Sequence, residues 1–144
     1  MAKARQVVEA SLDAINARDE ERLRSCYADD VVLEAPGDVR LEGSDAVVEY
    51  SMDWLRAFPD ARIDVITEVA NGDWVAQRLV VEGTHEGTLV GPAGKIPATH
   101  RRFKAVADEF VRVQDGRITE QYRSFDQAEV LKQLGLIPEL AATA

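Results

Sequence analysis

The sequence is poor in residues that bind metals or form disulfides. It has one cysteine, Cys26, and two histidines, His85 and His100, in 144 residues. A single cysteine excludes an internal disulfide, and two widely spaced histidines without an HxH or HExxH pattern do not indicate a metal site. Glycine-rich phosphate-binding patterns such as GxGxxG are also absent. We therefore expect neither a metal nor any other cofactor.

Long apolar runs and basic blocks are lacking as well. No apolar run approaches the roughly 20 residues that span a bilayer, and Glu9 and Asp13 interrupt the N-terminal segment, unlike a secretory or transit peptide. Asp and Glu number 26 against 17 Lys and Arg, which gives a net charge of −9. Such an acidic surface repels phosphate backbones and anionic lipids. We expect a cytoplasmic protein with no nucleic-acid or membrane partner.

The composition itself is that of a globular domain. Hydrophobic residues make up 46% of the chain and charged residues 30%, a balance that supports one substantial core. The sequence contains no internal repeat, linker or low-complexity segment. We therefore treat residues 1–144 as a single domain.

The first part of the chain, to about residue 58, has helical spacing. Val8, Leu12 and Ile15 form one apolar stripe on a helix predicted over residues 2–17. Capping and helix-breaking residues predict the other boundaries. Asp19 is the predicted N-cap of a short second helix, which is followed by a turn at 27–30, a strand at 31–33 and a loop from Pro36 to Gly43. Ser44 is the predicted N-cap of a third helix, which ends near Phe58 because Pro59 follows.

Beyond Pro59 the period becomes alternating. It predicts strands at 61–70, 73–85, 100–113 and 117–125, a longer connection at 87–97, and a final helix from the N-cap Asp126 to Gly135. Asn71-Gly72 and Asp115-Gly116 favour tight hairpin turns because both dipeptides tolerate positive φ. Helices followed by an antiparallel meander describe an α+β domain. A strongly curved sheet leaves a concave face, where ligand pockets form.

Short segments along residues 27–138 carry a family resemblance. They are YADD (27–30), FPD (58–60), GTHEG (83–87), PAT (97–99), RVQDGRI (112–118) with Glu120, FD (125–126) and QLGLIP (133–138). None is specific alone, but the ordered set resembles the SnoaL-like polyketide cyclases (ester cyclases) of the nuclear transport factor 2-like superfamily. The resemblance implies a cone-shaped, curved antiparallel sheet packed on three N-terminal helices, with a short C-terminal helix, and a homodimer.

The resemblance also maps the family's functional positions onto this chain. The acid–base aspartate of the cyclases falls on Arg123, and the histidine two residues before it falls on Gln121. Epoxide hydrolases of the superfamily also hold an aspartate at the Arg123 position. In the ketosteroid isomerases the base falls on Ala35 and the helix-one tyrosine on Ser11, whereas the oxyanion-hole acid falls on Glu109, which keeps a carboxyl group.

Glu109 is also singled out by its own strand. Alternation from Phe103 to Val113 places it in an otherwise apolar, inward-facing row. A buried carboxyl group must be protonated, ion-paired or hydrogen-bonded, and we predict Arg123 on the neighbouring strand as its partner. Two interpretations stay open. The pair is structural, or it is functional, with Glu109 as general acid or base or with Arg123 holding an anionic substrate oxygen.

Other candidates come from parity and spacing. His85 falls at an alternating position that faces inward on its predicted strand, as Val75, Leu79 and Val81 do. It therefore either shuttles protons in the pocket or hydrogen-bonds a loop carbonyl. Three aromatic residues recur at helical spacing on the third helix and serve either the core or a pocket wall for a flat polycyclic ligand. The predicted substrate contacts are Tyr50, Trp54, Phe58, Gln121, Ala35 and Ser11.

Together these features predict a cofactor-independent acid–base enzyme of cyclase or isomerase type. Its substrate is an apolar, carbonyl-bearing small molecule, and Glu109, Arg123 and His85 are the predicted catalytic residues. Two alternatives remain: a non-catalytic binding protein for a hydrophobic metabolite, and an epoxide-hydrolase-like enzyme.

Overall fold

The computed structural model describes residues 3–91 and 94–137. The helices are α1 (Ala4–Ala17), α2 (Glu20–Ser25), α3 (Ser44–Ala57) and α4 (Gln127–Gln133). The strands are β1 (Tyr27–Ala35), β2 (Val39–Glu42), β3 (Arg62–Asn71), β4 (Trp74–Thr84), β5 (Leu89–Gly91), β6 (Gly94–Ile96), β7 (Arg102–Gln114) and β8 (Arg117–Phe125).

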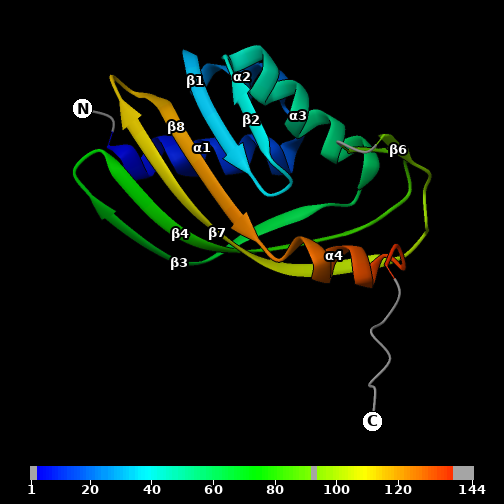
Figure 1. Cartoon of the computed structure of the whole chain (residues 1–144). Helices are drawn as coiled ribbons and strands as arrows, with labels where there is room; N and C mark the ends of the chain where they lie inside the picture. Colours follow the sequence, from blue (N-terminus) through cyan, green and yellow to red (C-terminus); the bar gives the residue numbers. More distant parts are fainter. Residues whose placement is uncertain (1–2, 92–93, 138–144) are drawn as a thin grey trace.

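One curved sheet dominates the architecture. Its strands lie in the order β2-β1-β8-β7-β4-β3, and β5 and β6 form a separate hairpin. The β1–β8 pair is parallel, whereas the other neighbouring strands are antiparallel. The sheet bends so that α1 and α3 lie on its concave side, with α4 beyond the end of β8 (Figure 1). The predicted α+β class, a cone-like sheet on three N-terminal helices with a short C-terminal helix, is confirmed.

The core fills the space between the helices and the concave face. The predicted apolar stripe on α1 is buried in it. None of the helices in the described ranges is long and apolar enough to cross a membrane. Strand β7 alternates as predicted, with Phe103, Ala107, Glu109, Val111 and Val113 buried on the inner face. An apolar inner face and an exposed outer face are what drive such a sheet onto its helices.

The end of α1 is fastened to the edge strand β3. Asn16 Nδ2 donates to the carbonyl of Ile63 at 2.9 Å, and the Ile63 amide donates back to Asn16 Oδ1 at 3.0 Å. Arg18, in the left-handed region at φ 56°, ends the helix and donates to the carbonyls of Pro59 and Ala61. These bonds satisfy polar groups of an unpaired sheet edge and set the distance between α1 and the sheet.

One short strand and the beginning of another were missed in the N-terminal half. Residues 27–30, predicted as a turn, begin β1, because Tyr27 is buried and pairs with Ile118 of β8. The predicted loop 36–43 contains β2, which pairs with β1. The start of β1 depends on a distant partner, β8, which no local signal indicates. Strand β2 pairs with β1 across the short turn at 36–38, where proline and glycine had indicated only a loop.

Two further boundaries differ from the prediction. Ser44 is the first residue of α3 and not its N-cap, a place taken by Gly43 at φ 96°, a conformation that glycine adopts without strain. The predicted connection at 87–97 contains the β5–β6 hairpin. By contrast, the hairpin turn at Asp115 and Gly116 is confirmed, with φ of 52° and 75°.

We use the name strap for residues 85–91 and 94–101, which leave β4 and return to β7. Backbone bonds close its base, from the His85 amide to the Arg101 carbonyl and from the His100 amide to the His85 carbonyl, each 2.9 Å long. The amides of Glu86 and Gly87 donate to the Ala57 carbonyl, at 3.0 and 3.1 Å. The strap therefore satisfies an orphan carbonyl at the C-terminus of α3.

Gly87 allows this close approach, and its replacement is the first testable prediction. A Cβ atom at residue 87 would overlap the backbone carbonyl oxygen of Arg56. We expect Gly87→Ala to lower the free energy of unfolding by about 1–3 kcal/mol, measured by chemical denaturation. The control is Gly91→Ala in the same strap, where the nearest atom lies at 3.8 Å. Equal stability of the two variants would contradict the packing argument.

Candidate active site

A cavity of about 90 Å³ lies between α1, α3 and the inner face of the sheet, and it is partly open to solvent. Its lining consists of Leu12, Ile15, Tyr50, Ser51, Trp54, Leu55, Ala61, Ile63, Leu79, Val81, Phe103, Ala105, Ala107, Glu109, Arg123 and Phe125. Of these, only Glu109 and Arg123 are charged. Typical ligand pockets have about 300–1,000 Å³, so the closed part holds only one portion of a larger ligand.

The Glu109 carboxylate is fully covered by hydrogen-bond donors. Its Oε2 accepts from Arg123 Nε at 2.7 Å and from Gln121 Nε2 at 2.9 Å, and its Oε1 accepts from Gln77 Nε2 at 3.0 Å. The Tyr27 hydroxyl in turn donates to Gln121 Oε1 at 3.3 Å. The predicted contact between Glu109 and Arg123 is confirmed. The three donors compensate for the water that this buried carboxylate has lost.

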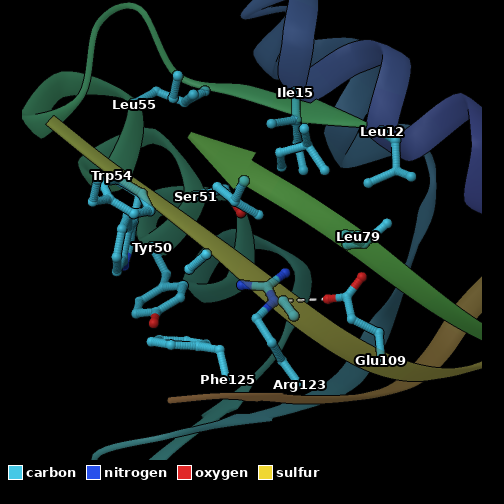
Figure 2. A pocket seen from close by; sticks show the side chains of 16 residues that line it. Leu12, Ile15, Tyr50, Ser51, Trp54, Leu55, Leu79, Glu109, Arg123 and Phe125 are labelled. Carbon is cyan, nitrogen blue, oxygen red and sulfur yellow. Dashed lines mark hydrogen bonds and ion pairs between the residues drawn. The ribbon is translucent and has the colours of Figure 1, made fainter. Parts of the chain in front are cut away.

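Both members of the pair line the cavity, and Arg123 is the more exposed of the two. Figure 2 shows its guanidinium turned into the space beneath α1 and α3, with the bond to Glu109 on one side. Its side chain is 20% exposed, against 0% for Glu109. Burial alone would lower the pKa of Arg123, but the Glu109 carboxylate and two nearby tyrosines raise it above its ordinary value. The cavity therefore contains a fixed positive charge.

Aromatic rings form another part of the cavity wall. Trp54 stacks on Phe58 with ring centroids 5.0 Å apart and meets the edges of Phe103 and Phe125 at 6.3 and 6.4 Å. Tyr50 and Trp54 line the cavity as predicted, beside Phe125 (Figure 2). Phe58 lies behind Trp54 and supports it without reaching the lining. The aromatic residues of the third helix thus divide between the two interpretations: Tyr50 and Trp54 form part of the pocket wall, whereas Phe58 belongs to the core.

Besides Phe58, three more of the predicted substrate contacts lie outside the cavity lining. Ser11 is buried in the core, where its hydroxyl donates to the Val8 carbonyl at 2.6 Å. Ala35 ends β1, at the edge of the main core cluster. Gln121 contacts the cavity only indirectly, through Glu109. The positions transferred from the isomerases therefore do not converge here, because β1 and this face of α1 do not reach the cavity.

His85 is inward-facing as its parity predicts, but it lies in the base of the strap. Its ring packs on Phe58 at 5.3 Å, and Nδ1 accepts from the Thr99 amide at 3.2 Å and contacts the Thr99 hydroxyl at 3.0 Å. Burial lowers the pKa of His85, so the imidazole is neutral. The partner is thus a loop residue, as the second interpretation expected, although it is an amide and a hydroxyl instead of a carbonyl.

Sequence reasoning missed Gln77 and Tyr27, which complete the network around Glu109. Gln77 shares the inner face of β4 with Val75 and Leu79, and all three are buried. The same signal that found Glu109, a polar residue in an apolar alternating row, was therefore available for Gln77. Tyr27 had no such signal, because its strand was predicted as a turn.

Residues 5–134 of this chain match a protein-family model described as SnoaL-like polyketide cyclase. The chain belongs to the SnoaL-like polyketide cyclase family. The resemblance of the short ordered segments is thereby confirmed, and so is the fold that it implied.

Curated relatives of this SnoaL-like chain include two ester cyclases. Aklanonic acid methyl ester cyclase DnrD from Streptomyces peucetius is 37% identical over 84 residues, which are 57% of this chain and 55% of that protein. Nogalonic acid methyl ester cyclase from Streptomyces nogalater is 36% identical over 84 residues, 57% of this chain and 60% of that protein. The matches thus span just over half the length of each relative.

Solved structures match over nearly the whole SnoaL-like domain. IdmH, a putative polyketide cyclase from Streptomyces antibioticus, has a TM-score of 0.78 and 29% identity, with 93% of this chain and 99% of that chain covered. AclR, a putative hydroxylase from Streptomyces galilaeus, has a TM-score of 0.80 and 25% identity, with 96% and 85% covered. One scaffold is thus found with differently named activities, so the site must decide the chemistry.

The buried, neutral His85 predicts a dependence of stability on pH. Its pKa is lowered in the folded state, so below about pH 6.5 the unfolded chain binds a proton that the folded chain does not. Acidification from pH 7.5 to 5 should therefore destabilise the wild type more than His85→Gln, by at most about 1.4 kcal/mol per pH unit. Urea denaturation at each pH measures this. His100→Gln, at an exposed histidine, is the control, and parallel curves for wild type and His85→Gln would refute the assignment.

Proposed function

We propose that this protein is a cofactor-independent enzyme of cyclase or isomerase type that acts on an apolar, carbonyl-bearing small molecule in the cavity. Family membership and the two ester-cyclase relatives support a polyketide-like substrate. The observation that carries the proposal is the single guanidinium of Arg123, held by Glu109 in an otherwise uncharged, partly aromatic cavity. Such a lining suits a flat ring system with one polar oxygen.

Arg123 would act where negative charge develops. In an intramolecular aldol addition a carbon acid first gives a proton to a base, here solvent water at the open side of the cavity, and becomes an enolate. The enolate carbon then attacks a carbonyl group to form the ring bond. The carbonyl oxygen becomes an alkoxide, which takes the proton back from the solvent. Negative charge rests on oxygen throughout, and a fixed donor in a cavity of low polarity stabilises it without reorganisation. Burial makes this interaction stronger than it is in water.

The geometry gives Glu109 a different role from the one its family position suggests. Its two oxygens accept three hydrogen bonds and donate none, so it cannot act as a general acid without losing a partner. We assign it the task of keeping Arg123 charged and oriented. The same coverage argues against an epoxide-hydrolase-like activity through Glu109, which would need a carboxylate oxygen free to activate water. His85, which lies outside the lining, takes no part in this proposal.

The experiment compares ring closure of aklanonic acid methyl ester and nogalonic acid methyl ester by wild type and Arg123→Met, followed chromatographically. We expect the variant to lower kcat/KM by about 100- to 1,000-fold, because it removes one oxyanion donor. Arg78→Met is the control, since Arg78 pairs with Asp108 on the outer face. Binding of either ester without turnover would favour the non-catalytic binding protein, and full activity of Arg123→Met would refute the assigned role.

We also propose that the protein is a homodimer that associates through the outer face of the sheet. Val69, Ala76, Phe110 and Tyr122 form one row across β3, β4, β7 and β8 on that face. Val69 and Phe110 are 65% and 58% exposed, and the row continues into Trp74, which stacks on Tyr122. A contiguous exposed apolar row of this kind suits a two-fold interface, in which the same patch meets its copy.

Phe110→Glu tests the interface. Placing a charge at the centre of the row should convert a dimer into a monomer at micromolar concentration, as measured by size exclusion with light scattering. Gln114→Glu adds the same charge at an exposed position near the end of β7 and should leave the dimer intact. A Phe110→Glu variant with the mass of the wild-type dimer would rule out this face.

A further inference from the structure

A row of three polar side chains crosses the inner face of the sheet. Gln77 on β4 lies opposite Glu109 on β7, and Glu109 lies opposite Arg123 on β8. Each neighbouring pair is joined by a hydrogen bond, of 3.0 Å from Gln77 Nε2 to Glu109 Oε1 and of 2.7 Å from Arg123 Nε to Glu109 Oε2. Directly opposite residues are the closest contacts that a sheet offers. The row thus links Gln77, which is not part of the cavity lining, to Arg123, which carries the positive charge of the cavity.

Gln77 is an unfavourable residue for its surroundings. It is 4% exposed between the buried Val75 and Leu79, and its Oε1 has no hydrogen-bond partner among the described residues. An unpaired buried amide oxygen costs free energy that an apolar side chain at the same place would not. Local conflicts of this kind concentrate where a residue serves function.

The hydrogen bond of Gln77 fixes the rotation of the Glu109 carboxylate. Oε2 already has two donors, Arg123 and Gln121, whereas Oε1 has Gln77 alone. Without Gln77 the carboxylate gains freedom about its last torsion, which is intrinsically soft. Rotation about this torsion moves Oε2 away from Arg123 Nε, and the guanidinium loses the contact that orients it.

We propose that Gln77 is a positioning residue that acts through Glu109 on Arg123, and that it thereby sets the preference of the cavity for an anionic over a neutral ligand oxygen. The inference rests on the proposed function, in which Arg123 binds the substrate oxygen. A guanidinium held in one orientation presents its remaining N–H groups at fixed positions, which a delocalised oxyanion can accept and a neutral amide or ester meets only in part.

The test uses two probes of equal shape, 2-naphthoate and 2-naphthamide, and measures their dissociation constants by calorimetry. The wild type should bind 2-naphthoate more tightly. Gln77→Met should reduce this preference about tenfold, the loss expected for one hydrogen bond to a charged group, while the dissociation constant of 2-naphthamide changes less than about twofold. Gln114→Met, at an exposed amide that contacts Thr119, is the matched control. A merely structural role would weaken both probes together and leave their ratio unchanged.

Two more variants keep the outcome decisive. Tyr27→Phe retains the buried ring but removes the hydroxyl that donates to Gln121, so it should lower the preference in the same direction by a smaller factor, even if Gln77→Met does not fold. Arg123→Met separates the two hypotheses. If it leaves the preference intact, or if the wild type shows none, the oxygen-binding role of Arg123 fails. If Arg123→Met abolishes the preference while Gln77→Met and Tyr27→Phe keep it, only the positioning role is overturned.

Discussion

The ion pair between Glu109 and Arg123 is the constraint on which the rest of the site depends. Taking two charges out of water is costly, and their attraction compensates only when the remaining lone pairs are satisfied. Gln77, Gln121 and, at one remove, Tyr27 satisfy them here. Four strands must therefore supply these side chains at fixed positions. The pair thus explains why polar residues interrupt the apolar inner rows of β4, β7 and β8, and why β1 begins with a buried tyrosine.

The rest of the fold places this pair at the border between the buried core and a cavity that is partly open to solvent. The fastening of α1 to β3 and the seating of the strap on α3 hold the two helices at a distance from the sheet. The space that remains is lined by apolar and aromatic side chains, with Arg123 as its one positive group among the lining residues. A low-polarity space around a fixed charge is what makes that charge effective toward a ligand oxygen.

The sequence predicted the elements that are long and strongly periodic, and with them Glu109, because each carries its own pattern. It failed at β2 and at the β5–β6 hairpin, which are short strands that pair with their neighbours in the chain and lie in segments rich in glycine and proline. It also failed at the start of β1, which forms through pairing with the distant strand β8. The same division applies to the site. Tyr50 and Trp54 were found from helical spacing, whereas Ser11 and Ala35 were taken from family positions and lie outside the cavity. A position that aligns with a functional residue of the superfamily can therefore hold a side chain of different chemistry, as Ser11 and Ala35 do here.

The Glu109–Arg123 contact itself depends on an irregularity that no local pattern indicated. At the β7–β8 turn Val113 lies opposite Ile118, but Arg112 lies opposite Glu120, so β8 carries one extra residue near Thr119. A one-residue shift exchanges the two faces of a strand. Beyond it Arg123 faces the cavity and Tyr122 faces outward, and an unbroken register would reverse them. One β-bulge therefore decides that this cavity holds a guanidinium and that the outer apolar row ends in a tyrosine.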